Sequence, residues 1–161
     1  MEFDYIVVGA GSAGCAVANR LSQCGNYLVA LIEAGPSDNS PRIHVPVGYY
    51  RTMGNPKSDW CYKTQSDKGI ADRSIPWPRG RVMGGSSSIN GLLYVRGQPQ
   101  DFDIWSQLGC TGWSWDGVLP YFKRSESWNG IDETGLRGKY GPLSVQSARL
   151  KRDIVDHWVD A

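Results

Sequence analysis

Two short apolar runs flank an amphipathic stretch at the start of the chain. Residues 5–8 form the first run, residues 28–32 form the second, and the stretch between them mixes apolar with polar positions. Continuous apolar runs of this length are typical of strands buried in a parallel sheet, and such strands are joined through a helix. The pattern therefore predicts a strand, a helix and a second strand within residues 1–35, which together make a βαβ unit.

The pattern changes after residue 35. From there to about residue 78 no helical or strand period lasts more than a few positions, although the segment is rich in Tyr and Trp. Because long segments without regular structure are uncommon in compact domains, we expect this one to wrap around a ligand or another domain. Further along, the periodicity predicts a helix over Asp101 to Leu108 with Asp101 as its N-cap, a second helix that contains residues 118–122 and ends near residue 130, a strand entered through Gly141, and a helical face of Leu150, Ile154, Val155 and Trp158.

Three glycines stand at the junction of the first predicted strand and helix, in the spacing Gly9-x-Gly11-x-x-Gly14. We expect Gly9 to allow the tight turn off the strand, Gly11 to let the main chain approach a pyrophosphate, and Gly14 to let the helix pack closely on the strand. The N–H groups at the start of the helix, around Ser12 and Ala13, would face the phosphates with the positive end of the helix dipole behind them. This part of the chain is predicted to bind a dinucleotide.

The second predicted strand ends on an acidic residue, Glu33, which is followed by the turn Ala34-Gly35-Pro36. A carboxylate in this place can accept hydrogen bonds from both ribose hydroxyls of an adenosine, and its charge would repel a 2′-phosphate. NADP is therefore disfavoured. FAD and NAD both satisfy this half of the site, so the βαβ unit by itself leaves the choice between them open.

A second group of small residues, residues 84–88, has the sequence Gly-Gly-Ser-Ser-Ser and is followed closely by Asn90-Gly91. Consecutive small residues let the main chain lie against a flat ring system, and their N–H groups can bond to phosphate or to ring heteroatoms. Asn90 can donate and accept hydrogen bonds at once. A flexible surface loop explains this run poorly, because large apolar residues bracket it on both sides.

Composition and charge exclude several classes of protein. The 161 residues carry 17 basic and 16 acidic side chains, so neither nucleic acid nor an anionic membrane is indicated as a partner. No apolar run is long enough to span a bilayer, and we expect no leader peptide before the first strand, which favours a cytoplasmic location. The four cysteines show no metal-site spacing, so we expect reduced thiols and no metal.

In combination, these features resemble the glucose–methanol–choline family of flavin oxidoreductases, and within it choline-dehydrogenase-like and alcohol-dehydrogenase-like members. The resemblance covers almost the whole chain. Met83 stands where members more often have Leu, a volume-conserving difference. The motifs that carry the resemblance are the glycine turn with Glu33, the signature from Gly80 to Gly97, and, in the family's order, residues 59–62 (Asp-Trp-Cys-Tyr), 112–115 (Gly-Trp-Ser-Trp), 118–122 (Val-Leu-Pro-Tyr-Phe) and 141–143 (Gly-Pro-Leu).

The resemblance implies FAD as the cofactor. The glycine turn and the helix start would bind its pyrophosphate, the end of the second strand would bind its adenosine with Trp60 near the adenine, and the signature would pass along the flavin and the ribityl chain. Some members attach FAD through a histidine at the position that Ile89 occupies here, so non-covalent binding is expected. The cofactor-binding residues implied are Gly9, Gly11, Ser12, Ala13, Gly14, Glu33, Ala34, Trp60, Val82, Gly85, Ser86, Asn90, Gly91, Leu92 and Leu93.

By the same resemblance the fold class is α/β. It implies a partial Rossmann-like FAD-binding domain over residues 1–130, followed by the beginning of an α+β substrate domain over residues 131–161. The first domain would hold the βαβ unit (1–35), the wrapping loop and the signature (36–100) and helices (101–130). An incomplete doubly wound sheet leaves apolar faces uncovered and a strand edge unpaired, so we expect poor solubility or dependence on a complementing C-terminal chain.

Members of the family oxidise the CH–OH group of an alcohol by hydride transfer to the flavin. Their base is a histidine near the C-terminus of a much longer chain. Neither His44 nor His157 is expected to serve as that base, so no catalytic residue is assigned and this chain alone is expected to be inactive. The implied partner is a small-molecule alcohol, choline-like or another primary alcohol.

Two other functions stay open at this stage. A non-catalytic flavin-binding or interaction module would use the same fold without turnover and would hold flavin that no alcohol reduces. An NAD-dependent dehydrogenase would bind nicotinamide and show no flavin spectrum, and the signature from Gly80 to Gly97 disfavours it.

Overall fold

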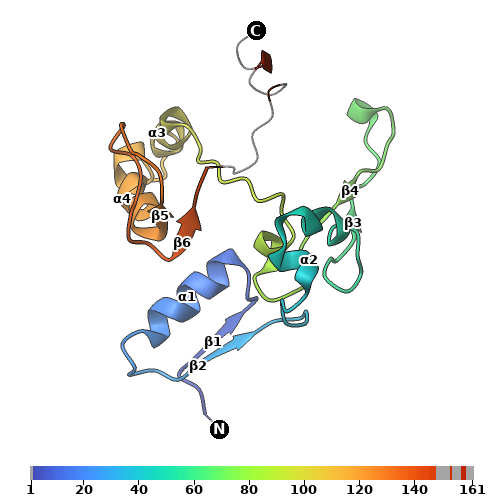
Figure 1. Cartoon of the computed structure of the whole chain (residues 1–161), viewed down its shortest axis with the longest axis horizontal. Helices are drawn as coiled ribbons and strands as arrows, with labels where there is room; N and C mark the ends of the chain where they lie inside the picture. Colours follow the sequence, from blue (N-terminus) through green and yellow to red (C-terminus); the bar gives the residue numbers. More distant parts are fainter. Residues whose placement is uncertain (1, 148–152, 154–156, 159–161) are drawn as a thin grey trace. The chain divides into compact units, whose positions relative to one another are not determined.

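The computed structural model describes residues 2–147, 153 and 157–158. The chain forms two compact units, residues 1–93 and residues 94–161 (Figure 1). The elements, with η for a 3₁₀ helix, are β1 (Tyr5–Val8), α1 (Ser12–Ser22), β2 (Val29–Ile32), α2 (Pro41–His44), η1 (Pro46–Arg51), β3 (Tyr62–Lys63), η2 (Lys68–Ile70), β4 (Pro76–Trp77), η3 (Gly85–Ser88), α3 (Pro99–Gln107), α4 (Trp115–Ser125), β5 (Glu126–Trp128) and β6 (Leu143–Val145).

The first unit begins with the βαβ arrangement that the apolar runs predict. β1 and β2 pair in parallel, with Tyr5 opposite Val29 and Val8 opposite Ile32. Figure 1 shows α1 along one side of this two-stranded sheet. The α/β fold class is thereby confirmed, as is the position of the predicted helix between the strands.

The segment after β2 contains only short elements within the described residues, of which η1 is six residues long. β3 and β4 form a short antiparallel hairpin that projects from the rest of this unit (Figure 1). Other parts of the segment return to the carboxyl ends of β1 and β2, where the N–H of Met83 donates to Pro36 O at 2.9 Å and that of Gly84 to Ala10 O at 2.8 Å. The absence of a long regular element in this stretch agrees with the prediction.

The second unit packs α3 and α4 together and adds a parallel pair of strands, β5 and β6. Phe102 is 8% exposed and lies at the centre of an aromatic cluster. Its ring centroid is 5.5 Å from that of Trp105, 5.7 Å from that of Trp115 and 5.6 Å from that of Phe122. Burial of these large rings is the main apolar contribution to packing in this unit.

The start of α3 differs from the prediction. The helix begins at Pro99, with Gln98 as the N-cap, so Asp101 is the third helical residue and not the cap. The Asp101 carboxylate instead accepts the Gln98 N–H at 2.8 Å, which satisfies a donor that the helix leaves free. Proline is favoured at the first helical position, because it lacks the N–H that would go unpaired there. That preference explains the earlier start.

The end of α4 also differs from the prediction. The helix ends at Ser125, and residues 126–128 form β5 instead of continuing the helix towards residue 130. Pairing with β6, from Glu126 opposite Leu143 to Trp128 opposite Val145, outweighs the local helical pattern. The strand predicted after Gly141 is confirmed as β6.

Large apolar side chains remain exposed on the β1–β2 sheet, among them Ile6 (62%), Val8 (81%) and Ile32 (51%). No helix in the described part of the chain is long and apolar enough to cross a membrane. Of the predicted C-terminal helical face, Leu150, Ile154 and Val155 lie outside the described residues, and Trp158 is exposed.

Candidate functional site

The glycine turn lies between the end of β1 and the start of α1. Gly9 has a φ of +92°, a left-handed conformation that residues with a Cβ rarely adopt. A Cβ on Gly14 would lie 1.8 Å from Gly9 O, so only glycine lets the first turn of α1 pack this closely on the turn after β1. Both glycines therefore have the structural tasks that their spacing predicts.

The amino end of α1 presents unused hydrogen-bond donors. The first helical bond of the described chain here runs from Cys15 N to Gly11 O at 2.9 Å. The preceding N–H groups, those of Ser12, Ala13 and Gly14, have no acceptor among the described residues, and the Gly11 cap offers no side chain. Three free N–H groups at the positive end of an 11-residue helix favour an anion.

Glu33 ties the ends of the two strands together. Its Oε2 accepts the N–H of Ala10 at 2.8 Å and its Oε1 accepts that of Gly35 at 3.0 Å. This structural role was not predicted, because the spacing of the motif indicates only a contact with ribose. Each carboxylate oxygen has a second lone pair, so contact with a ribose hydroxyl is compatible with these bonds and stays a prediction.

The signature packs directly on the glycine turn. We call residues 80–85 the platform. Gly85 has a φ of +58°, and a Cβ on it would lie 2.8 Å from Gly11 Cα. A Cβ on Gly35 would lie 2.0 Å from Arg81 O, on the other side of the platform. Two glycine-rich segments far apart in sequence thus form one continuous main-chain surface at the carboxyl ends of β1 and β2.

Buried aliphatic side chains hold the platform and η3 in the first unit. Val82 and Ile89 are each 1% exposed, and the Ser86 hydroxyl accepts the Gly80 N–H at 3.1 Å. By contrast, Asn90 to Leu93 lie at the surface, and Leu92 has a φ of +63°. The structure therefore brings Gly85 to the glycine turn, with Val82 and Ser86 next to Gly85. Contact of the Asn90 to Leu93 run with a cofactor stays a prediction.

Asp59 organises the loop that carries Trp60. The side chain is 2% exposed; its Oδ2 accepts Gly54 N–H at 2.6 Å, and its Oδ1 accepts those of Cys61 and Arg79, both at 2.9 Å. Burial by itself would raise the pKa of Asp59, but the three main-chain N–H donors and the nearby Arg79 charge outweigh it and lower the pKa below 3.8. This role was not predicted from the sequence, in which Asp59 stands only as the first residue of the motif at residues 59–62.

Trp60 lies next to Asp59 and is 43% exposed. Its ring stacks on Tyr62, with centroids 5.9 Å apart and an interplanar angle of 2°. The guanidinium of Arg81 also lies over the Trp60 ring, with its Cζ 5.4 Å from the ring centroid. An exposed, stacked indole at the edge of the platform is compatible with the predicted place of an adenine.

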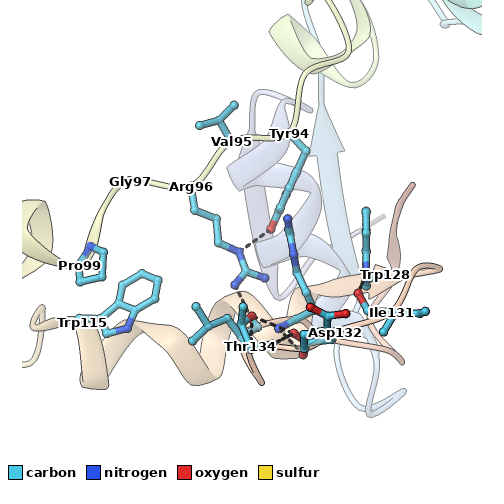
Figure 2. Close-up of a pocket in the computed structure, with 13 residues that line it drawn as sticks. Tyr94, Val95, Arg96, Gly97, Pro99, Trp115, Trp128, Ile131, Asp132 and Thr134 are labelled. Atoms are coloured by element: carbon cyan, nitrogen blue, oxygen red, sulfur yellow. Dashed lines mark hydrogen bonds between the residues drawn. The ribbon is translucent and has the colours of Figure 1, made fainter. Parts of the chain in front are cut away.

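The second unit contains a pocket beside a buried ion pair. Figure 2 shows Trp115, Trp128 and Ile131 among the side chains that line it, together with Arg96. The Glu126 side chain is fully buried and accepts from Arg96 Nη2 at 2.5 Å and from Arg137 Nη1 at 2.9 Å. Opposite charges at this distance compensate each other, so the arginines here serve packing within the unit.

Asp132, on the same pocket, shapes the adjoining loop. Its Oδ2 accepts the Arg137 N–H at 2.9 Å, and its Oδ1 accepts the Thr134 hydroxyl at 2.9 Å. These bonds, led by the one from Arg137, lower the pKa of Asp132 to about 2. None of the predicted cofactor residues lines this pocket.

The parallel βαβ unit and its glycine turn are those of the dinucleotide-binding class of α/β proteins. Residues 3–159 match the family model described as GMC oxidoreductase. The chain belongs to the GMC oxidoreductase family, which confirms the resemblance in sequence.

Named relatives and solved structures agree with this membership. The chain is 50% identical over 143 residues to an oxygen-dependent choline dehydrogenase of Photobacterium profundum, a match that covers 89% of this chain and 25% of that protein. It is 45% identical over 161 residues to the protein of the same name in Brucella anthropi, covering 100% of this chain and 29% of that protein. It thus spans less than a third of the length of these relatives.

Two oxidases of known structure resemble the chain in fold. A pyridoxine 4-oxidase from Mesorbium loti superposes with a TM-score of 0.81 at 39% identity, over 89% of this chain and 28% of that one. A formate oxidase from Aspergillus oryzae RIB40 superposes with a TM-score of 0.85 at 32% identity, over 98% of this chain and 29% of that one.

Proposed function

We propose that this chain is the FAD-binding N-terminal part of an oxidoreductase that oxidises the CH–OH group of an alcohol. The observation that carries the proposal is the meeting of two glycine-rich segments at the amino end of α1. There Gly85 lies against Gly11, and the N–H groups of Ser12 and Ala13 have no acceptor in the described part of the chain. A diphosphate supplies both the acceptors and the negative charge that such a surface favours.

The residues of this chain would bind and orient the cofactor. Donors at the start of α1 would hold the diphosphate, and Glu33, with Ala34 beside it, would receive the adenosine through its remaining lone pairs. When bound, FAD would supply the acceptor for a hydride from the alcohol carbon. Because Ile89 has an inert, buried side chain, the binding would be non-covalent.

The substrate class follows from the relatives rather than from this chain. Proteins named oxygen-dependent choline dehydrogenase, at 45% to 50% identity, support a choline-like or other primary alcohol. The base that takes the hydroxyl proton is not assigned to a residue here. His44 is a poor candidate, because its side chain is 59% exposed and lies 3.7 Å from Asp38.

A charge placed at the amino end of α1 tests the FAD site. We expect the 161-residue chain to quench flavin fluorescence on binding FAD, and Ser12→Asp to weaken that affinity by about ten-fold or more through repulsion of the diphosphate. An acid at this end stabilises a helix by about 0.3–1 kcal/mol, so the melting temperature should hold or rise. Loss of binding would then not be explained by loss of fold.

The matched control places the same charge at the other end of the same helix. Gln23 is the C-cap of α1, and Gln23→Glu should leave FAD affinity within roughly two-fold of that of the parent chain. A folded parent chain that leaves flavin fluorescence unchanged would refute the proposal. Equal FAD affinities for Ser12→Asp and Gln23→Glu would refute the placement of the diphosphate.

A non-catalytic flavin-binding or interaction module stays the second candidate. The two functions separate on the protein in its complete form: an alcohol bleaches the flavin absorbance of the enzyme and leaves that of the module unchanged. The cytoplasmic location, a complementing C-terminal chain and the domain boundary at residues 130–131 stay predictions.

A further inference from the structure

We propose that Arg81 is a further cofactor-contacting residue, whose guanidinium binds phosphate oxygens of the dinucleotide beside the Trp60 ring. This inference rests on the proposed FAD site and adds a cationic side chain to a surface otherwise made of main-chain donors. Arg81 lies within the signature from Gly80 to Gly97 but is not among the cofactor-binding residues that the resemblance implies.

The main chain of Arg81 is built into the platform. Its N–H donates to Ser58 O at 2.8 Å, and its carbonyl oxygen occupies the space that a Cβ on Gly35 would need. The preceding residue, Gly80, is packed so closely that a Cβ on it would lie 2.2 Å from the Gly85 carbonyl. Since Gly85 in turn lies on Gly11, Arg81 sits in the same packed layer as the start of α1.

The guanidinium of Arg81 lacks a hydrogen-bond acceptor. Within the described residues no carbonyl or carboxylate accepts from any of its nitrogens, and Nε is buried with no partner. A guanidinium carries five N–H donors and stays charged at all ordinary pH values, and buried donors without an acceptor are rare. The arginines of the second unit show the usual arrangement, because Arg96 and Arg137 both pair with Glu126.

The nearby carboxylates do not fill this need. The carboxylates of Glu33 and Asp59 accept main-chain N–H groups, and within the described residues neither forms an ion pair or a hydrogen bond with the Arg81 guanidinium. The missing partner is therefore an external group with several acceptor oxygens and negative charge. Phosphate has this chemistry and matches the fork of a guanidinium, and stacking on Trp60 orients the fork.

Binding of ADP, adenosine and FAD to the 161-residue chain, measured by isothermal titration calorimetry, tests the inference. We expect Arg81→Met to weaken ADP and FAD by roughly 10- to 100-fold, and adenosine, which has no phosphate, by less than about three-fold. The dependence of ADP affinity on salt should become weaker as well. Arg81→Lys keeps the charge but not the fork, and should weaken ADP by about three- to ten-fold.

Arg51→Met is the matched control. Arg51 also lies over an aromatic ring, that of Tyr50 at 5.7 Å, but it is an exposed residue of η1 and not part of the platform. Its replacement should change each affinity by less than roughly two-fold.

Any of four results would overturn the inference. Unchanged ADP affinity in Arg81→Met would remove Arg81 from the site while the FAD site itself stands. Equal losses for adenosine and ADP would show that Arg81 acts through the Trp60 stack and not on phosphate. A parent chain that binds neither ADP nor FAD would refute the proposed function and this inference with it. Should Arg81→Met not melt cooperatively, Arg81→Lys decides, and parent-like ADP affinity in that variant overturns the inference.

Discussion

Each of the two units of the chain is stabilised internally by a different kind of chemical group. In residues 2–93 the closest long-range contacts join main-chain atoms. The start of α1 packs against the turn after β1 at Gly14, and the platform packs against the same turn at Gly85. In residues 94–147 side chains carry the long-range connections, and a fully buried Glu126 holds two arginines that are far apart in sequence.

This difference explains why the described part of the first unit leaves main-chain donors free for a ligand, whereas the buried charges in the described part of the second unit pair with one another. A surface of close-packed main chain leaves N–H groups free at its edge, as at Ser12 and Ala13, and those groups can receive a ligand. In a charged cluster whose donors and acceptors bond to one another, few hydrogen-bonding groups remain for a ligand. Arg96 donates to Glu126, to Leu136 O and to the Tyr94 hydroxyl.

Replacement of Gly14 gives the largest expected effect. Gly14→Ala places a methyl group 1.8 Å from Gly9 O, so we expect the first unit to lose about 3 kcal/mol or more in free energy of unfolding, with FAD binding lost. Urea unfolding followed by circular dichroism measures this. Gly11→Ala is the control, because its nearest contact would be 3.9 Å away: stability should change by less than about 0.5 kcal/mol while FAD affinity falls. A Gly14→Ala chain as stable as the parent would show that close main-chain packing at Gly14 does not stabilise the first unit.

The second prediction concerns the buried carboxylate. Glu126→Gln leaves two guanidiniums without their counter-charge, so we expect a loss of about 3–5 kcal/mol in the free energy of unfolding of the second unit. Glu133→Gln, a change at an exposed acid in the neighbouring loop, should cost less than about 0.5 kcal/mol. If the two variants unfold alike, side-chain charge does not hold this unit together.

Asp59, like Glu33, departs from this comparison, since its side chain organises main chain in the first unit. In Asp59→Asn an amide NH₂ faces a main-chain N–H, so we expect a loss of about 1.5–3 kcal/mol. Asp67→Asn, at an exposed aspartate that accepts only the Gly69 N–H in the described structure, should have a smaller effect.

The same carboxylate predicts how stability depends on pH. The folded-state pKa of Asp59 lies below the usual 3.8, so its contribution is present above pH 3.8 and is lost as the pH falls through the folded-state pKa. Asp59→Asn should lack this part of the acid destabilisation, and melting temperatures between acid and neutral pH would measure it. Identical pH profiles for the two proteins would contradict the assignment.

The smallest effect is expected at the start of α3. Asp101→Ala removes the carboxylate that accepts the Gln98 N–H, at a cost of about 1 kcal/mol. The control is Gln100→Ala, at an exposed position in the same turn. Asp103 would not serve as a control, because its carboxylate accepts the Trp115 N–H at 3.0 Å. Equal melting temperatures for Asp101→Ala and Gln100→Ala would show that the cap contributes nothing.

The sequence by itself determined the βαβ unit, the tasks of Gly9 and Gly14, and the family. These depend on local rules: an apolar run of given length, a turn that requires positive φ, and a helix that needs a residue without Cβ at one spacing. Tertiary structure alone decided that residue 126 starts a strand, that Glu33 joins two strand ends, and that Arg81 stands without an acceptor. Each of these features depends on residues that are distant in the chain. Contacts between distant residues produce no periodicity or spacing in the sequence, so they cannot be predicted from it.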